Sequence, residues 1–288
     1  MDFDIFKGVD EVYITGHTNP DADSLVSAKI MRDILSYNGI KAQWIVWEGD
    51  KPDISSKMLL DNIVDCQPKV FCHNDAKDKF FLLVDHNDVM QSVKENGKVL
   101  AAIDHHSSSG QVKNLFLSDY CCTALYIYMM FKDKYKFSDM QKEQIFRAFL
   151  SDSVFGRSSR YKPDKDGNAV CQLGYDNNYE KYFERYFVPT DLSNLDKSFR
   201  ENGVKSYKYA WAEMQSGYIE AMDTKYMEEY KQFVKSFNGN FLGIWLDYSV
   251  PKTYAFFKYN ENFYEYEYNC VASRAALIMP QIIKTFGK

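Results

Sequence analysis

Two apolar runs, Phe80–Val84 and Val99–Ile103, constrain the fold most, because neither alternates with polar residues. Such runs are typical of strands that are covered on both faces of a parallel sheet. Each run ends in a cluster of carboxylate and imidazole side chains, Asp85–Asp88 after the first and Asp104–His106 after the second. In open α/β sheets, ligands bind at this end of the strands. The sequence therefore predicts a polar site at the carboxyl edge of a parallel sheet.

The first 155 residues alternate strand-like runs with segments of helical spacing. We expect strands at Val12–Thr15, Ala42–Trp47, Phe80–Val84 and Val99–Ile103, and helices at Ser24–Asn38, Ser55–Ile63, Ala124–Phe131 and Gln141–Leu150. This alternation predicts an α/β fold with a parallel, doubly wound sheet. The polar stretch Ser158–Asn178, which contains Pro, Gly and Asn, is expected to be a surface loop.

The remainder of the chain predicts a smaller α/β C-terminal domain. Its expected elements are a helix at Lys225–Phe237, strands at Phe241–Leu246, Thr253–Phe257 and Phe263–Tyr268, and a final helix at Ser273–Phe286. The best candidate for a linker is Val188–Thr190, which divides the chain into residues 1–188 and 189–288. Thr253–Tyr268 is interpreted as a packed β-hairpin, although its aromatic rings could also stack on a nucleobase.

Composition narrows the class of protein. The 288 residues are 45% hydrophobic and carry a net charge of −5, which favours a packed core and argues against a stable nucleic-acid complex. No apolar run reaches the ~20 residues of a membrane helix, and the acidic start lacks the apolar region of a signal peptide. The six cysteines form no C-x-x-C pair and are expected to be reduced core thiols. We therefore expect a soluble, cytoplasmic protein.

Four of the five histidines fall in polar clusters at the ends of expected elements, whereas His73 is interpreted as structural. Two imidazoles and four carboxylates in these clusters could hold two cations if one carboxylate bridges. They are His17, Asp21, Asp23, Asp85, His105 and Asp152. Paired cations ~3.5–4 Å apart can activate water and neutralise phosphate oxygens. Mixed imidazole and carboxylate ligands favour Mn²⁺ over Mg²⁺ and Ca²⁺.

Each cluster also has a structural explanation. Asp23 or Ser24 could simply cap the helix that follows. Asp85 and Asp104 could be turn residues at strand ends, and a lone Asp152 near a helix end could be solvated surface. Because clusters of the same chemistry all lie at element ends in one α/β domain, a metal site is the interpretation that we adopt.

These motifs resemble those of the DHH phosphoesterase superfamily, and within it the manganese-dependent (family II) inorganic pyrophosphatases and related exopolyphosphatases. The matching segments are Gly16–Ser24, Leu83–Asp88, Ile103–His106, Cys122–Ala124 and Leu150–Ser153. They follow one another in the family's order over residues 11–155. A weaker match, Cys270–Arg274 with Pro280 after it, resembles the signature of a DHHA2-type C-terminal domain.

The resemblance implies two metal groups that share Asp85, which would bridge the two ions and so be catalytic. The first group is His17 and Asp21, and the second is Asp23, His105 and Asp152. His106 would contact the substrate and help to protonate the leaving group. Arg274 would bind the far phosphate as a planar fork. Hydrogen bonds from three further residues would orient the ligands: Asn19, His86 and Asp104.

One departure concerns the substrate. The family signature continues with lysines after the arginine, whereas this chain has Ala275 and Ala276. The segment after Asp152 also differs from the pyrophosphatase pattern. It offers Arg157 as a substrate contact, and Arg160 beside it, although both could be solvated surface arginines. Another family lysine has two candidates, Lys197 and Lys205.

Three functions follow from these observations. The first is a Mn²⁺-dependent hydrolase that cleaves phosphoanhydride bonds of pyrophosphate or short polyphosphate with a two-metal-activated water; Co²⁺ or Mg²⁺ could replace Mn²⁺. The second is a DHH phosphodiesterase or nucleotidase acting on a small nucleotide or short oligonucleotide. The third is a non-enzymatic metal-binding module. We adopt the first, with a small phosphate-rich substrate, no membrane partner and an allowance for a homodimer.

Overall fold

The computed structural model describes residues 1–50, 67–94, 97–187 and 189–287. Contacts divide the chain into two compact units. The first unit is formed by Met1–Gly156 and Tyr161–Tyr186, and the second by Arg157–Arg160 and Phe187–Lys288. The expected helix at Ser55–Ile63 lies outside the described residues, and so does Val188 of the expected linker. A domain boundary between residues 188 and 189 stays a prediction.

The first unit is built on a six-stranded sheet in the order β3-β2-β1-β4-β5-β6, and all the pairings in it are parallel. Its strands are β1 (Val12–Thr15), β2 (Ala42–Trp47), β3 (Lys69–Phe71), β4 (Phe80–Val84), β5 (Lys98–Asp104) and β6 (Leu115–Leu117). This order is that of a doubly wound α/β sheet. The expected fold class is therefore confirmed, and β3 and β6 are short edge strands that periodicity did not reveal.

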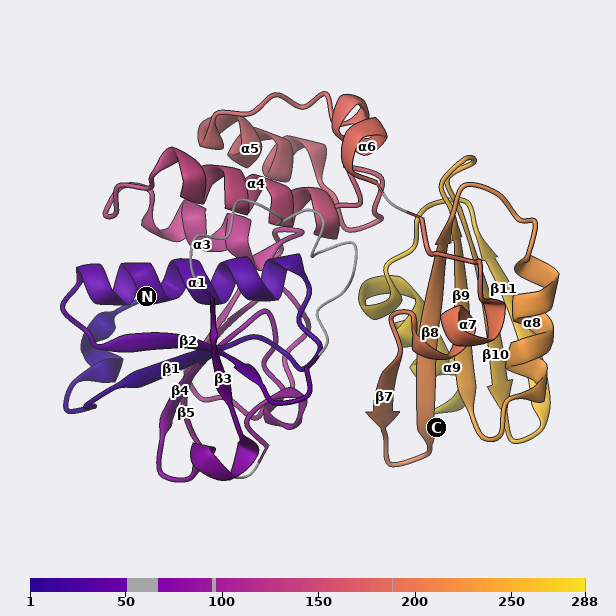
Figure 1. The fold of residues 1–288 in the computed structure, drawn as a ribbon, viewed down its shortest axis with the longest axis horizontal. Coiled ribbons are helices and arrows are strands. Elements are labelled where there is room, and N and C mark those ends of the chain that lie inside the picture. The colour runs from indigo at the N-terminus through magenta and orange to yellow at the C-terminus, as the bar shows by residue number, and fades with distance from the viewer. Residues whose placement is uncertain (51–66, 95–96, 188, 288) are drawn as a thin grey trace. The chain divides into compact units, whose positions relative to one another are not determined.

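Three helices cover one face of this sheet (Figure 1). They are α1 (Ala22–Tyr37), α3 (Thr123–Phe131) and α4 (Asp139–Asp152). Helix α4 begins with a capping box in which Ser138 and Gln141 bond each other's backbone. The other face buries an apolar cluster that includes Tyr13, Trp47 and Phe81, covered in part by the 3-10 turns at His73–Ala76 and Val89–Gln91. A further 3-10 turn, Phe3–Phe6, begins the chain.

The stretch Ser158–Asn178 was expected to be a surface loop, and that expectation is wrong. A π-helical turn spans Pro163–Gly167, and α5 (Asn168–Leu173) follows it directly. Three apolar residues of α5 are buried: Ala169, Val170 and Leu173. Burial of these side chains stabilises a short helix that its polar composition did not predict. Helix α6 (Glu180–Tyr186) then completes the first unit.

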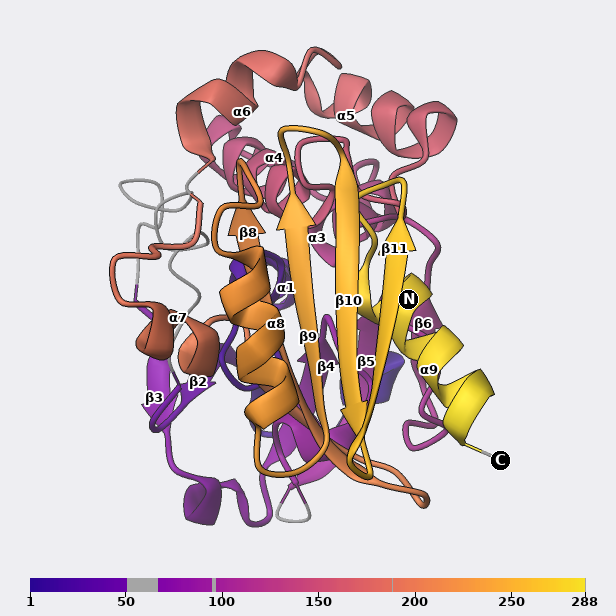
Figure 2. The same cartoon turned by 90° about the vertical axis from the view of Figure 1, so that its right-hand side faces the viewer.

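The second unit has a five-stranded mixed sheet in the order β11-β10-β9-β8-β7, in which only β8 and β9 pair in parallel. Its strands are β7 (Lys205–Lys208), β8 (Glu213–Ala221), β9 (Phe241–Asp247), β10 (Lys252–Tyr259) and β11 (Asn262–Tyr268). Strands β10 and β11 form the expected hairpin. The second unit also contains α7 (Leu195–Glu201). Helix α8 (Met227–Ser236) crosses one face of the sheet (Figure 2), where Tyr230 and Val234 join the core.

The final helix differs from the expected single element. A π-helical turn, Arg274–Ile278, precedes α9 (Met279–Phe286). Phe286 of α9 packs on Phe257 and Tyr264 of the hairpin, with ring centroids 5.2 and 4.8 Å apart. These rings are therefore engaged in the packing of the second unit. Among the described helices, none is long and apolar enough to cross a membrane.

The described cysteines are all free thiols, but they are not all in the core. Cys121 and Cys122 are buried, as expected. Cys171 is exposed on α5, so the expectation of a core thiol is wrong there. His73 was expected to be structural, and it stacks on Trp47 with ring centroids 4.4 Å apart.

Candidate metal centre

The site lies at the point where the strand order of the first unit reverses. Strands β1 and β4 are neighbours, with β2 and β3 on one side and β5 and β6 on the other. The loops after β1 and β4 therefore leave in different directions and open a crevice between them. Gly16 follows β1, and a Cβ there would lie 2.6 Å from Cβ of Ser24. Only glycine lets the first turn of α1 come this close to the strand end.

The first cluster at this crevice joins His17, Asp21 and Asp85, whose ligand atoms lie within 4.8 Å of one another. Nε2 of His17 is 3.3 Å from Oδ2 of Asp21 and 3.6 Å from Oδ2 of Asp85. The other carboxylate oxygen of Asp21 accepts the backbone N–H of Ser24 and so caps α1. The helix cap is thus Asp21, and the alternative of Asp23 or Ser24 in that role is wrong.

The second cluster joins Asp23, Asp85, His105 and Asp152 within the same limit. Nε2 of His105 lies 3.2 Å from Asp85, 3.3 Å from Asp152 and 4.0 Å from Asp23. Asp152 reaches the cluster from the last residue of α4, and it is the most exposed of the four, at 20% of its side chain. The solvated-surface alternative for Asp152 therefore does not hold.

Asp85 belongs to both clusters, and its backbone is unusual. The residue has a φ of +62°, in the left-handed region that non-glycine residues rarely occupy. Its N–H bonds the carbonyl of Ile103 on β5 at 2.9 Å. Its carboxylate accepts hydrogen bonds from the hydroxyls of Ser24, at 2.7 Å, and Thr123, at 3.3 Å. Strained backbone held by several contacts is typical of functional sites.

The close packing of carboxylates in the two clusters shows whether a cation fits there. Burial and the nearby charge of Asp85 raise the pKa of Asp23 to about 7. Burial also raises the pKa of Asp85, with a further contribution from Asp21. Carboxyl groups this close and this buried cannot all ionise unless positive charge is added. Together with two imidazoles, they form a donor set that suits a transition metal.

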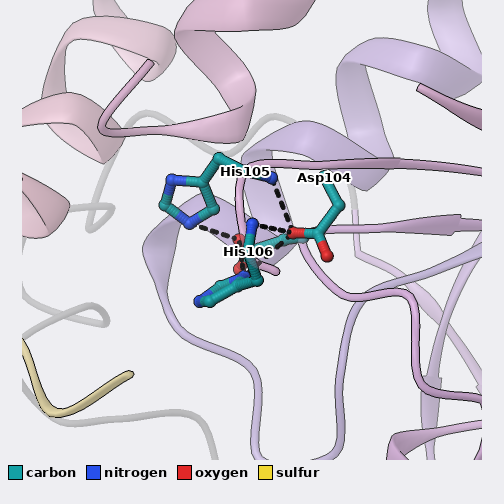
Figure 3. A group of neighbouring side chains, drawn as sticks. Asp104, His105 and His106 are labelled. Atoms are coloured by element: carbon teal, nitrogen blue, oxygen red, sulfur yellow. Dashed lines mark hydrogen bonds and ion pairs between the residues drawn. The ribbon is translucent and has the colours of Figure 1, made fainter. Parts of the chain in front are cut away.

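Asp104 and His106 lie beside the second cluster, and together with Asp85 and His105 they form a further group of possible ligands within the same limit. Asp104 is fully buried, and one of its oxygens accepts the backbone N–H groups of His105 and His106 and Nδ1 of the His106 ring. Figure 3 shows the His105 ring turned away from this carboxylate. Burial works against ionisation of Asp104, but the bonds and charges of His106 and His105 hold its pKa well below the ordinary value. Asp104 is thus an ionised anchor for both histidines.

His86 and Asn19 support the site in different ways. His86 is buried between the carbonyl of Val84, at 2.9 Å, and the hydroxyl of Ser92, at 2.6 Å, and burial lowers its pKa to about 4. It is therefore a neutral structural ring next to the cluster. Asn19 has a φ of +53°, and its backbone N–H donates to Asp50 at 3.0 Å. This contact fixes the loop that carries His17.

Some supporting residues were missed by sequence reasoning. Asn87 donates to Asp104 at 2.5 Å and to the carbonyl of Ser107 at 3.0 Å. Asp50 accepts backbone N–H groups from Asn19 and Trp47. Asn87 lies within the Asp85–Asp88 motif, so its position next to the strand end was a usable signal. No pattern in the sequence connects Asp50 to the first motif.

The two candidate substrate arginines belong to the second unit. Nη1 of Arg274 donates to the carbonyls of Gly203, at 2.7 Å, and Ser216, at 3.2 Å, and its guanidinium lies 5.4 Å from the ring centroid of Tyr218. Arg157 is half-buried. Burial raises the pKa of Tyr248 well above its usual value, and the charge of Arg157 opposes that shift. Whether Arg157 contacts the substrate or is a surface arginine stays a prediction.

The other basic candidates in the second unit differ in exposure. Arg160 is half-buried, in the same segment as Arg157. Lys197 is exposed on α7, and Lys205 is half-buried at the start of β7. Neither lysine is thereby identified as a substrate contact, and the assignment of the second family lysine stays open.

Fold and site define an α/β domain with a candidate metal centre at its switch point. Residues 11–151, about half of the chain, match the model of the DHH family, N-terminal domain. About half of the chain is similar in sequence to manganese-dependent inorganic pyrophosphatases, and nearly all of it is similar in fold to a solved structure.

Two relatives illustrate the sequence similarity. The chain is 29% identical over 161 residues to a probable manganese-dependent inorganic pyrophosphatase of Staphylococcus carnosus, covering 52% of this chain and 50% of the relative. It is 36% identical over 99 residues to the manganese-dependent inorganic pyrophosphatase of Methanothrix thermoacetophila, covering 34% and 31%. The chain thus spans about half the length of the first relative and less than a third of the second.

A solved structure extends the similarity of fold to both units. A Methanococcus jannaschii protein assigned to the family II inorganic pyrophosphatases has a TM-score of 0.75, with 19% identity over 96% of this chain and all of that one. An exopolyphosphatase-related protein from Bacteroides fragilis has a TM-score of 0.50 at 13% identity, over 98% of this chain and 94% of that one. At these identities the likeness concerns the fold.

Proposed function

We propose that this chain is a metal-dependent phosphohydrolase that cleaves the phosphoanhydride bond of pyrophosphate or a short polyphosphate. The observation that carries the proposal is the pair of buried clusters that share Asp85 at the switch point. The names of the sequence relatives support pyrophosphate as the substrate and manganese as the metal. When bound, two divalent cations supply an activated water and neutralise charge on the phosphate oxygens.

The residues of the first unit divide the work. His17 and Asp21 would hold one ion, Asp23, His105 and Asp152 would hold the other, and Asp85 would contact both. The hydroxyls of Ser24 and Thr123 orient the Asp85 carboxylate for this role. Mn²⁺ suits the mixed nitrogen and oxygen donors best, and Co²⁺ or Mg²⁺ are the alternatives.

His106 is the candidate proton donor. Its Nδ1 edge bonds Asp104 at 2.9 Å, and a third of the side chain remains exposed. The Nε2 edge is therefore the one that a substrate would meet. In the protonated form it would give its proton to the phosphate that leaves, while Asp104 stabilises the imidazolium.

The second unit would supply positive charge to the substrate. Because two backbone carbonyls hold Arg274, we propose that it acts as a fixed charge rather than a mobile fork. Arg157 would add a second charge and offset the lysines replaced by Ala275 and Ala276. The aromatic rings of the hairpin pack on α9, so we do not favour the nucleotidase alternative. A cytoplasmic location, a homodimer and the absence of a nucleic-acid complex stay predictions.

The test is phosphate release by the purified full chain with Mn²⁺, comparing pyrophosphate, tripolyphosphate and a dinucleotide at equal concentration. Turnover of pyrophosphate or tripolyphosphate, abolished by a chelator and restored by Mn²⁺, would support the proposal. Turnover of the dinucleotide alone would replace it with the nucleotidase function. No turnover with any metal would leave a metal-binding module.

A further inference from the structure

The segment Tyr120–Ala124, which leads into α3, contacts two members of the second cluster. The N–H groups of its last two residues donate to the carboxylate oxygens of Asp23, at 2.6 and 2.7 Å. The carbonyl of its first residue lies 3.3 Å from Nδ1 of His105. That contact directs Nε2 of the same ring at Asp85 and Asp152. A shift of this segment would therefore move Asp23 and His105 together.

A single buried carboxylate holds the segment from the outside. Asp166 has 0% of its surface exposed. One of its oxygens accepts the N–H of Cys121 at 3.1 Å, and the other accepts the N–H of Lys162 at 2.7 Å. It thus links the segment before α3 to the π-helical turn Pro163–Gly167. Buried hydrogen bonds to a carboxylate are stronger than exposed ones and fix geometry more firmly.

Weaker contacts reinforce this attachment at the surface. Nζ of Lys162 donates to the carbonyl of Asp119 at 2.8 Å and to its carboxylate at 2.7 Å. Nζ of Lys165 also pairs with Asp119 and lies 4.2 Å from the ring centroid of Tyr120. Since exposed ion pairs contribute little, Asp166 is the main link between the segment and the turn Pro163–Gly167.

We propose that Asp166 is a positioning residue for the second metal cluster, and that it acts through the backbone of Tyr120–Ala124. The inference rests on the proposed function, because a position matters only where the cluster holds a cation. It assigns a role to the turn after residue 160, which sequence reasoning had placed in a surface loop. Asp166 touches neither the cluster nor the substrate, so its effect is on ligand geometry alone.

The experiment compares Asp166→Asn with Asp164→Asn in the full chain, by Mn²⁺ titration in a calorimeter. Asparagine keeps the size of Asp166, but its NH₂ group must face one of the two N–H donors. Asp164 is exposed in the same turn and serves as the matched control. We expect D166N to weaken one Mn²⁺ site about tenfold and leave the other unchanged, which is the range for substitutions behind metal ligands. D164N should change neither site.

Activity distinguishes positioning from loss of structure. D166N should reach the wild-type kcat at saturating Mn²⁺, with a half-saturating concentration raised about tenfold. A protein damaged in general would lose kcat at every Mn²⁺ concentration, which would overturn the inference. Equal Mn²⁺ titrations for D166N and D164N would also overturn it and leave the proposed function intact. Should D166N melt below the assay temperature, Lys162→Met removes the side-chain contacts with Asp119 and so tests the surface part of the link between the segment and the turn, with an expected weakening of the same site of about threefold.

A measurement on metal-free protein separates this inference from the proposed function. Amide hydrogen exchange at Thr123 and Ala124 should be faster in D166N than in D164N, because the segment has lost its buried attachment. Equal exchange rates would overturn the inference whatever the enzyme does. If wild-type protein binds no Mn²⁺ while exchange does respond, then the proposed function fails and the attachment itself stands.

Discussion

The two units place their charged side chains in opposite ways. In the first unit, Asp23, Asp85 and Asp152 converge on buried positions, and the ion pairs found for them among the described residues are with histidines. In the second unit, Nη1 of Arg274 donates to two backbone carbonyls of the same unit. The first arrangement gathers negative charge that an added cation would offset, whereas the second holds a positive charge against neutral carbonyls. We therefore expect that Mn²⁺ stabilises the first unit and leaves the stability of the second unit unchanged.

The largest effect should come from Asp85→Asn, because this residue belongs to both clusters. Loss of one charge there removes several kcal/mol of metal-mediated stabilisation, and a loss of about 4 kcal/mol corresponds to roughly a thousandfold slower phosphate release. Steady-state kinetics and Mn²⁺ calorimetry measure the two consequences. The control is Asp88→Asn in the same motif, where the side chain accepts from the backbone N–H of Met90 and the side-chain amide of Gln111. Wild-type rates for D85N would mean that the clusters are structural.

The second unit should respond to Arg274→Ala in stability rather than in metal binding. The carbonyls of Gly203 and Ser216 would lose a charged donor, which costs about 2 kcal/mol of unfolding free energy. Urea denaturation measures that loss, and Mn²⁺ calorimetry should show unchanged affinity. Arg200→Ala is the control, since its exposed pair with Asp196 contributes under about 0.5 kcal/mol. A loss of unfolding free energy in R274A no larger than in R200A would contradict the structural role. Altered Mn²⁺ affinity in R274A would contradict the expected difference between the units.

Mn²⁺ affinity should rise about tenfold from pH 6 to pH 8, because the Asp23 proton, with a pKa of about 7, must leave before the cation binds. In metal-free protein, the same group makes the folding stability fall, rather than rise, as the pH increases. This folded-state pKa lies above the ordinary 3.8, so the contribution is fully present below pH 3.8 and is lost as the pH rises through 7. Calorimetry in buffers of different ionisation enthalpy counts the released proton. A pH-independent affinity would argue against Asp23 as a ligand.

The smallest effects should follow loss of the two hydroxyls that bond Asp85, and Ser24→Ala should have the larger effect of the two. The serine hydroxyl donates to Asp85 at 2.7 Å, and a net hydrogen bond of about 1 kcal/mol corresponds to roughly fivefold weaker Mn²⁺ binding. Calorimetry again gives the affinity. Thr123→Val, which removes the longer bond of 3.3 Å, should change it less. The reverse order of effects would indicate that these hydroxyls do not orient the carboxylate.

The metal clusters were predictable because their geometry follows from strand ends. His17, Asp85 and His105 each come within two residues of the end of a strand, and parallel strands bring such ends to one edge. Residues next to the ligands in the sequence, such as Ser24 and Asn87, are part of the same motifs and so could be placed near the site. Asp152 was less certain from its own sequence, since only the packing of α4 carries it to His105.

The positions of Asp166 and Arg274 were not predictable in this way. Asp166 lies among proline, glycine and lysine residues, a composition typical of loops, and contacts made 45 residues away bury it. The partners of Arg274 are carbonyls, which every residue possesses, so no pattern of side chains can indicate them. Local composition therefore predicts the position of a side chain that follows a strand end. It does not predict the position of a side chain whose partners are backbone groups.

The span of the metal ligands along the chain has a consequence for biosynthesis. The first of them follows β1 and the last ends α4, so nearly all of the first unit must leave the ribosome before a cation meets its full set of donors. A partly made chain would carry His17 and Asp21 without their partners and would hold metal weakly. Tight metal uptake would therefore mark the moment at which the chain has been synthesised and folded as far as the end of α4, before α5 and α6 complete the unit.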